Sequence, residues 1–348
     1  MKDDHLAGLR LFNQHISNPH FNECADVVKY MVAMQAQDYA GAKWAVGLRM
    51  QNANEAAIEK AITEGKILRT HLFRPTWHFV SPADIRWILE LTAPRINAIN
   101  AGMYKKFEVS NAIFDKTNDV LIKVMQGNKH LTRAEITSAL NHAGIATDDL
   151  RLTILLMHAE LDAVICSGGR IGKQFTYALL DERAPATPAL THEEALIRLG
   201  TGYFNSRGPA TVHDFANWSG LTIADAGIGL QNIKKQLISE IIAGKTYWMP
   251  DNTDIIPVKP KAYLLPAFDE FAIAYKHRDA LVNPRYLVQA RHVIFDPVIV
   301  VDNQVAGNWK RTIKTNSINI SFNLYGKLNK AQAKAVEMAA KRYNKFFS

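Results

Sequence analysis

The feature that most constrains the fold is a recurring pattern of helix, glycine-containing turn, helix and strand pair. One copy begins at Thr132, which has the capping-box spacing to Glu135, and its first helix ends before Gly144. Two helices joined by a short turn and followed by a β-hairpin are typical of a winged-helix unit. The elements predicted for this copy are helices over 133–141 and 147–161 and strands over 163–167 and 175–179.

A plainer copy of the pattern lies further along the chain. Thr211 and Thr222 each precede a predicted helix, and Gly220 lies between the two helices. Threonine is a favoured N-cap residue, and glycine is favoured just after a helix end. The predicted elements are helices over 192–204, 211–218 and 223–240 and strands over 241–242, 245–249 and 255–258.

The N-terminal copy is the least regular. Asn54 caps a predicted helix, and Arg74-Pro75 bends two extended runs into a hairpin. After this hairpin, Ser81 and Pro82 indicate the start of a further helix, predicted from Ala83 to about Thr92. The elements predicted for the N-terminal copy are helices over 5–15, 23–34 and 55–64 and strands over 67–73 and 76–80.

The C-terminal part is rich in strands. Asp302-Asn303 is a turn signal, and the predicted elements are strands over 298–301, 305–309 and 317–324 and a helix over 328–347. The sequence therefore predicts an α+β fold: three tandem winged-helix units, then a small C-terminal β-barrel-like domain with a terminal helix. The predicted domain boundaries are 1–80, 81–186, 187–260 and 261–348.

The composition is that of a basic globular protein. The chain has 348 residues, 48% of them hydrophobic, and a net charge of +8. A basic balance favours a polyanionic partner, although many mildly basic proteins bind no nucleic acid. Cys24 and Cys166 match no metal or disulfide spacing, and no apolar run approaches the roughly 20 residues of a membrane span. Since the N-terminus also lacks the pattern of a signal peptide, we expect a cytoplasmic, nucleoid-associated protein.

The segment Gln35-Ala36-Gln37 is the most informative candidate for chemistry. Residues two apart share a face in extended backbone, so both amides can converge on one target if the preceding helix ends near Met34. An amide can orient a water molecule but is too weak a base to activate it strongly. Such a pair suits a leaving group that is already activated, such as a cationic N-alkylated purine, and Asp38 is the nearest carboxylate. On spacing alone, two surface or capping amides are the simpler interpretation.

Three further segments help to decide whether these glutamines are catalytic or merely surface amides: 68–80, 264–271 and 307–311. Together with Gln35-Ala36-Gln37 they resemble, in the expected order, the motifs of the AlkZ/YcaQ family of DNA glycosylases. The glutamine at position 37 resembles the AlkZ branch, because the YcaQ branch has an acidic residue there. The resemblance implies three winged-helix units with a C-terminal β-barrel. It also implies excision of alkylated purines, including interstrand crosslinks, with Gln35 and Gln37 as the catalytic residues.

The implied partner is double-stranded DNA that is alkylated or crosslinked, and we expect a monomer. No phosphate-binding glycine loop or nucleotide fingerprint is present in the sequence, so we expect no cofactor and no metal. An amide at Gln37 in place of a carboxylate predicts a narrower or slower enzyme, because a carboxylate would stabilise an oxocarbenium ion better.

The candidate DNA contacts are basic or imidazole side chains near the predicted motifs. A pair of basic residues is most often simply exposed to solvent, and a lone histidine most often has a structural role. Each candidate therefore has a simpler interpretation than DNA contact. The candidates are Arg69, His71, Arg74 and His78 around the first hairpin, Lys234 and Lys235 in the middle of the helix predicted over 223–240, and His277, Arg278, Lys310 and Arg311 near the C-terminal domain.

Two other functions fit a winged-helix pattern. A non-catalytic DNA-binding protein, such as a transcriptional regulator, would normally carry an effector or dimerisation module in place of a small barrel. A protein-docking role is disfavoured by the basic charge. The sequence therefore favours a monofunctional DNA glycosylase that hydrolyses the N-glycosidic bond of N7- or N3-alkylated purines.

Overall fold

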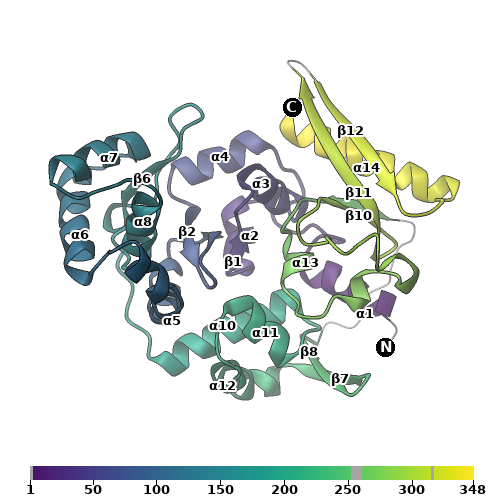
Figure 1. The fold of residues 1–348 in the computed structure, drawn as a ribbon. Helices are drawn as coiled ribbons and strands as arrows, with labels where there is room; N and C mark the ends of the chain where they lie inside the picture. The colour runs from purple at the N-terminus through teal and green to yellow at the C-terminus, as the bar shows by residue number, and fades with distance from the viewer. Residues whose placement is uncertain (1–2, 252–260, 315–316) are drawn as a thin grey trace. The chain divides into compact units, whose positions relative to one another are not determined.

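The computed structural model describes residues 3–251, 261–314 and 317–348 (Figure 1). The chain forms two compact units: unit 1 combines Met1–Glu59 with Leu196–Ser348, and unit 2 is the intervening Lys60–Ala195. Both units contain helices and short antiparallel strands, which confirms the predicted α+β class. The strand predicted over 255–258 lies outside the described residues. No helix in the described ranges is long and apolar enough to cross a membrane.

The N-terminal segment is mainly helical, but its helices differ from the predicted ones. The second helix ends at Tyr30, earlier than predicted, because Val32 has a φ of +62° that a right-handed helix cannot contain. An additional helix over 39–48 is buried along residues 41–48, so it lacks the polar face that would have revealed it in the sequence. The elements are α1 (Asp3–Asn13), α2 (Cys24–Tyr30), β1 (Ala33–Gln35), α3 (Tyr39–Leu48) and α4 (Glu55–Thr63).

The second segment of unit 1 begins with a helical group. Capping residues start two of its helices as predicted, since Thr211 forms a capping box with Asp214 and Thr222 accepts a hydrogen bond from the backbone of Asp225. Gly220, with φ +73°, provides the left-handed turn between them. The elements are α10 (His192–Arg207), α11 (Val212–Ser219), α12 (Ile223–Ile233), the 3₁₀ turn η1 (Lys234–Gln236), β7 (Ile238–Ile242) and β8 (Lys245–Met249).

The helix predicted over 223–240 is wrong in its second half. Helix α12 ends at Ile233, and Lys234 and Lys235 lie in the 3₁₀ turn η1 instead of in the middle of a helix. The following segment contains Ile238, Ile241 and Ile242, whose branched side chains favour extended backbone, and it pairs with β8 as an antiparallel hairpin.

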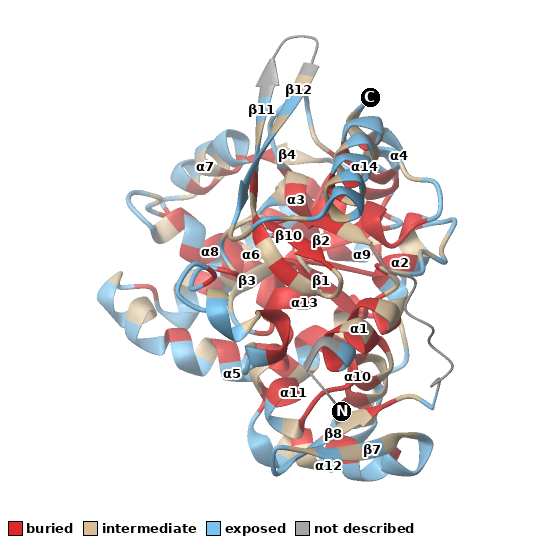
Figure 2. Cartoon of the chain, turned by 90° about the vertical axis from the view of Figure 1, so that its right-hand side faces the viewer, coloured by how far each residue is buried: buried red, intermediate tan, exposed pale blue. Residues whose placement is uncertain are grey.

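The C-terminal strands form one antiparallel sheet in the order β12-β11-β10-β9. Asp302 and Asn303 form the tight turn between β10 and β11, both with positive φ. Helix α14 packs against β9, and β10 is buried along its whole length (Figure 2). The elements are β9 (Ala262–Leu265), α13 (Glu270–Ile273), η2 (Asp279–Leu281), η3 (Pro284–Tyr286), β10 (Val298–Val301), β11 (Gln304–Lys314), β12 (Ser317–Leu324) and α14 (Lys330–Phe347).

The barrel-like closure predicted for this part is corrected by the strand order. Within the described ranges the sheet is open, with β9 and β12 as its two edges. Four strands are too few to curl into a closed barrel, which needs roughly five to eight strands in small domains. The terminal helix predicted over 328–347 is confirmed as α14.

Unit 2 has a core of helices beside a three-stranded sheet in the order β4-β6-β5 and a separate hairpin of β2 and β3. The capping box of Thr132 and Glu135 is confirmed at the start of α7. The elements are β2 (Leu68–Leu72), β3 (Thr76–Val80), α5 (Ile85–Lys106), α6 (Asn111–Met125), β4 (Leu131–Thr132), α7 (Arg133–His142), α8 (Arg151–Leu161), β5 (Ile165–Ser167), β6 (Thr176–Leu179) and α9 (Leu180–Arg183).

Helix α5 begins and ends later than the predicted range from Ala83 to about Thr92. It runs through Pro94, although proline removes a helical hydrogen bond. Buried residues on both sides of the proline, such as Leu89 and Ile96, pack into the core and keep the two halves in one helix.

Candidate active site

Gln35 is the last residue of β1, and its side chain lies beside the backbone that follows. The backbone N–H of Gln37 donates to Gln35 Oε1 at 2.9 Å. Ala36 between them is buried, whereas Gln35 is half-buried and Gln37 is exposed. The structure therefore places the Gln35 amide against the backbone of Gln37, on the less buried side of the segment. Because an N–H requires an acceptor, the bond also determines which end of the Gln35 amide is the oxygen.

The backbone of Gln35 is held by a buried carboxylate. Its N–H donates to Glu270 Oε1 at 2.9 Å. The other carboxylate oxygen, Oε2, accepts from Arg207 Nε at 2.9 Å and Nη2 at 2.7 Å, and from Trp218 Nε1 at 2.9 Å. The side chains of Glu270 and Arg207 are 1% and 0% exposed, so this ion pair is removed from water and both of its charges are compensated.

Arg207 also holds the residues that lead into β1. Its Nη1 donates to the carbonyl of Met31 at 2.9 Å and its Nη2 to the carbonyl of Ala33 at 2.7 Å. One guanidinium thus contacts the backbone before β1 and within it, while Glu270 contacts its last residue. Because a planar guanidinium has donors in fixed directions, these bonds determine the path of the chain as far as Gln35.

A second buried ion pair lies next to the first. Arg49 donates to both oxygens of Asp269 at 3.1 Å, and its Nη2 also donates to Gln14 Oε1 at 2.8 Å. Gln14 Nε2 in turn donates to the hydroxyl of Tyr275 at 3.0 Å, and that hydroxyl donates to the carbonyl of Arg207 at 2.8 Å. The two pairs are therefore linked in one buried hydrogen-bond network, which makes a rigid support.

These supporting residues were not identified from the sequence. The segment 264–271 resembles a family motif, but that resemblance assigns no role to Asp269 or Glu270. Two adjacent carboxylates within an apolar segment were the available signal, because acidic residues are rarely buried without cationic partners. The identities of those partners, Arg49 and Arg207, have no local signal, since each lies far from its carboxylate in sequence.

Asp38, the carboxylate next to the glutamines in the sequence, is the N-cap of α3. Its side chain accepts from the backbone N–H of Gly41 at 3.1 Å, and the residue is exposed. A cap of this kind satisfies one of the unpaired N–H groups at the helix start. The position of this carboxylate is thus explained by the helix that it begins.

The buried tyrosines around β1 are neutral donors. The Tyr30 hydroxyl donates to the carbonyls of Asn13 at 2.8 Å and Asn205 at 3.1 Å, and burial raises the pKa of Tyr30 to about 12. Burial likewise raises the pKa of Tyr275 to about 12. Because the charged form of a buried phenol is penalised, both remain protonated at neutral pH and serve as structural hydrogen-bond donors.

Three of the four candidates around the first hairpin are buried within unit 2. Arg69 lies over the ring of Trp77, 4.0 Å from its centroid, and His71 contacts the buried carboxylate of Glu160. His78 Nδ1 lies 2.8 Å from the carbonyl oxygen of Thr76. Arg74 is the exposed one, at the turn between β2 and β3. Their contact with DNA remains a prediction.

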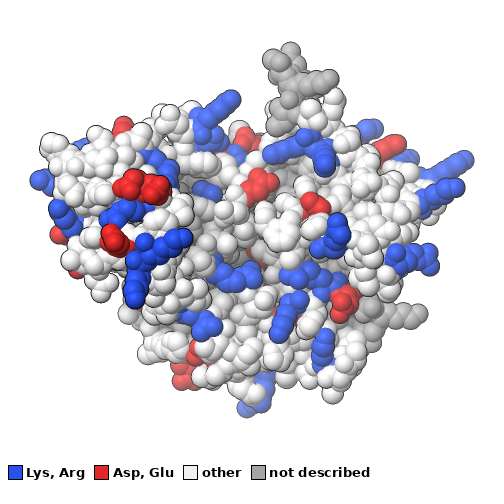
Figure 3. All heavy atoms as spheres, viewed as in Figure 1, with Lys and Arg blue, Asp and Glu red and all other residues white. Residues whose placement is uncertain are grey.

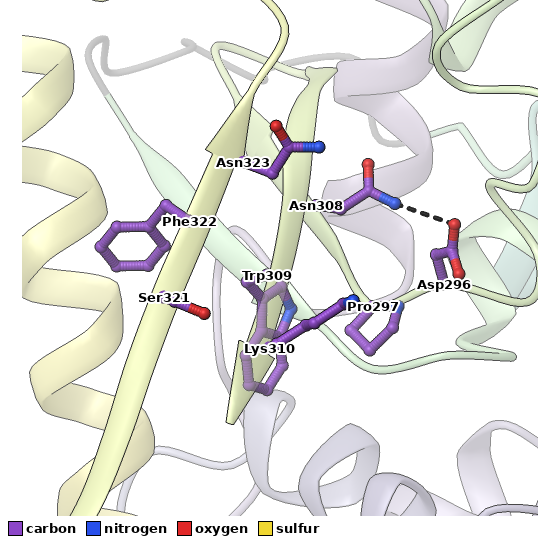
Figure 4. A pocket seen from close by; sticks show the side chains of 8 residues that line it. All are labelled: Asp296, Pro297, Asn308, Trp309, Lys310, Ser321, Phe322 and Asn323. Atoms are coloured by element: carbon purple, nitrogen blue, oxygen red, sulfur yellow. Dashed lines mark hydrogen bonds between the residues drawn. The ribbon is translucent and has the colours of Figure 1, made fainter. Parts of the chain in front are cut away.

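The remaining candidates are in unit 1. Lys234 and Lys235 are exposed, and so is His277, which lines a pocket of about 480 Å³ beside the start of α11. Lys310 lines another pocket, of about 390 Å³, formed by residues of β11 and β12 together with Asp296 and Pro297 (Figure 4). Arg278 donates to the carbonyl of Ala272 at 2.9 Å, and Arg311 donates to the hydroxyl of Tyr343. On the face seen in Figure 3, lysine and arginine side chains are scattered rather than gathered into one patch.

Comparison with known proteins places the chain in a family. The family described as "DNA glycosylase AlkZ-like" matches residues 28–346. The interstrand DNA cross-link repair glycosylase of Streptomyces sahachiroi is 21% identical over 309 residues, covering 82% of this chain and 81% of that protein. The solved structure of Streptomyces sahachiroi DNA glycosylase AlkZ superposes with a TM-score of 0.78 at 19% identity, covering 99% of this chain and 96% of that one. The chain therefore belongs to the AlkZ-like DNA glycosylases, enzymes that hydrolyse N-glycosyl bonds.

Proposed function

We propose that this enzyme is a monofunctional glycosylase for N7- or N3-alkylated purines, including those in interstrand crosslinks, and that Gln35 and Gln37 position the attacking water. The observation that carries the proposal is the fixed Gln35 amide, held by Glu270 on its backbone and by the Gln37 N–H on its side chain. The relative from Streptomyces sahachiroi, which carries the name of a cross-link repair glycosylase, supports the crosslinked class of substrate.

The chemistry suits two amides. Gln35 Oε1 has a second lone pair that can accept from a water molecule, and its amino group can donate toward the sugar. In the reaction the bond between the sugar C1′ and the purine nitrogen breaks, and its electron pair neutralises the cationic base. Water adds to C1′ and releases its proton to solvent. An amide orients this water without deprotonating it, so the rate depends on a base that leaves readily.

We propose that the recurring helix-turn-helix and hairpin segments bind double-stranded DNA as three winged-helix units, with boundaries at 1–80, 81–186, 187–260 and 261–348. The pairs α7–α8 and α11–α12, each of which begins with a capping box and is followed by a hairpin, support two of these units. The net charge of +8 supports a polyanionic partner. We further propose a monomer that acts in the cytoplasm on nucleoid DNA, because one chain carries both the glutamines and the basic candidates.

Abasic-site formation on a duplex with a single N7-methylguanine tests this function. Under single-turnover conditions we expect Gln35→Ala and Gln37→Ala each to slow base release by about 100-fold, the scale of losing one positioned hydrogen-bonding group. Duplex affinity should stay near the wild-type value. Gln51→Ala, at an exposed glutamine outside the segment, is the matched control.

Two outcomes would overturn the proposal. Wild-type release rates in the double variant Gln35→Ala/Gln37→Ala would remove the glutamines from the reaction. Tight binding to one undamaged sequence without any base release would instead favour the non-catalytic regulator.

A further inference from the structure

Building on the proposed function, we infer that Phe268 and Phe295 form an aromatic wall that binds the cationic alkylated base beside Gln35. The two rings lie edge to face, with centroids 5.8 Å apart and an interplanar angle of 86°. Phe295 is 62% exposed, and Phe268 is partly exposed. Two aromatic rings that remain in contact with solvent offer a surface on which a flat base can stack.

The aromatic wall is attached to the segment that supports Gln35. Phe268 lies two residues before Glu270, whose carboxylate accepts the N–H of Gln35 at 2.9 Å. The same segment also passes close to Asp38. A Cβ atom built on Gly41 would lie 2.5 Å from Asp38 Oδ2 and 3.1 Å from the Cβ of Pro266. Residues 266–270 therefore run alongside the chain from Asp38 back to Gln35.

The backbone of Phe268 is held in an unfavourable conformation. Its φ of +61° lies in the left-handed region, which is uncommon for a bulky residue and which glycine or asparagine adopts more easily. A hydrogen bond from its N–H to the carbonyl of Ile294, 2.8 Å long, ties it to the segment that carries Phe295. Strain of this kind collects at ligand sites, and here its structural result is an aromatic side chain presented beside its partner ring.

The chemistry of the wall matches the proposed substrate. An N7- or N3-alkylated purine carries a positive charge until it leaves the sugar, and the face of an aromatic ring attracts cations. A carboxylate also follows the wall in the chain, since Asp296 comes directly after Phe295. Asp296 accepts from Asn308 at 3.0 Å at the edge of the pocket in Figure 4. The wall should therefore select charged bases over neutral ones.

The aromatic wall should affect how tightly and how selectively the base is bound, more than how fast the glycosidic bond is cleaved. The positive charge passes from the base to the sugar as the bond breaks, so a contact with the cationic base is strongest before the transition state. Loss of the wall should thus weaken binding of the charged base, while the rate constant of the bound complex should not fall.

Two non-cleavable probes of equal shape test this inference. One duplex carries 2′-deoxy-2′-fluoro-N7-methylguanosine, which is charged and resists hydrolysis, and the other carries 2′-deoxy-2′-fluoro-7-deaza-7-methylguanosine, which has the same sugar and a neutral base. We expect the wild-type enzyme to prefer the charged probe by about three- to thirtyfold. Phe295→Leu and Phe268→Leu should bring this ratio of dissociation constants toward one, and Phe295→Trp should retain it.

Phe12→Leu, at a partly exposed phenylalanine of α1 outside the wall, is the control that should leave the ratio unchanged. Because Phe295 is exposed, its variant decides the test even if Phe268→Leu fails to fold. An unchanged ratio in Phe295→Leu would overturn the aromatic wall. Absence of base release by the wild-type enzyme would instead overturn the proposed function, and the two failures are distinguishable because the binding ratio needs no cleavage.

Discussion

The carboxylate of Glu270 accepts the backbone N–H of Gln35 at 2.9 Å, although the two residues are 235 positions apart in the sequence. The same carboxylate is paired with Arg207, which donates to the carbonyls of Met31 and Ala33, upstream of Gln35. The position of the candidate catalytic strand is therefore determined by residues from the second segment of unit 1, and changes there should affect stability and activity together.

Glu270→Gln should destabilise the protein strongly. The substitution keeps the shape of the side chain but leaves the buried charge of Arg207 without its partner, which costs about 3–5 kcal/mol in comparable pairs. The free energy of unfolding in urea measures this loss. Asp181→Asn removes the exposed partner of Arg86 and serves as control, with little or no expected change. A Glu270→Gln protein as stable as the wild type would contradict the role assigned to this ion pair.

Two substitutions at Asp38 distinguish a role of its side chain in capping α3 from a role in catalysis. Asp38→Ala removes the acceptor for the Gly41 N–H and should cost about 1 kcal/mol of stability, whereas asparagine is nearly as good a cap. We expect Asp38→Asn to retain both stability and base release. The measurement pairs urea unfolding with single-turnover release, and a stable Asp38→Asn variant that releases base slowly would show a catalytic need for the carboxylate.

Stability should depend on pH through Glu160. Burial raises the pKa of this carboxyl above its ordinary value of 4.5, despite the opposing effects of His71, Arg69 and Arg133. Among the residues that the structure describes, one of its oxygens also has no hydrogen-bond partner. The native state therefore binds the proton more tightly than the unfolded state. The stabilising contribution is fully present below pH 4.5 and is lost as pH rises through the higher native pKa.

The test compares unfolding of the wild type and Glu160→Gln in urea at several pH values. The stability of the wild type relative to the variant should fall as pH rises, because glutamine stays neutral throughout. A relative stability that increased with pH would mean that the charged carboxylate is the favoured native form.

The salt dependence of DNA binding identifies which basic residues contact phosphates. A side chain that neutralises one phosphate should lower the slope of log affinity against log salt by about 0.9 when it is removed. We expect this for the exposed Lys235 and Lys310 on changing each to alanine. Lys334, exposed on α14 and outside the predicted contacts, is the control. Unchanged slopes for Lys235→Ala and Lys310→Ala would remove both from the DNA interface.

Local signals in the sequence predicted much of the fold. The capping boxes that begin at Thr132 and Thr211 use side chains three residues apart, so the helix starts could be identified without knowledge of tertiary contacts. The hairpin of β2 and β3 and the turn at Asp302 were predicted for the same reason. Elements that depend on burial were not predicted correctly. Helix α3 was missed because it lacks a polar face, and α5 was predicted too short because packing keeps it helical beyond Pro94.

The same difference between local and distant interactions decides which parts of the candidate site could be predicted from the sequence. The Gln35-Ala36-Gln37 segment was visible because its pattern is contiguous and resembles a family motif. Its support was not, because the hydrogen bond between Gln35 and Glu270 and the ion pair with Arg207 join residues from distant parts of the chain. Spacing along a sequence carries no information about which buried carboxylate will meet which guanidinium.

The division of unit 1 into two segments determines when the site can form during synthesis. The ribosome adds about 5–20 residues per second, so Glu270 emerges roughly 12–47 seconds after Gln35, with all of unit 2 made in between. Until then β1 lacks both the arginine and the carboxylate that hold it. A nascent or prematurely terminated chain therefore carries the two glutamines without the support that orients them, so the capacity to cut bases from DNA should arise only near the end of translation.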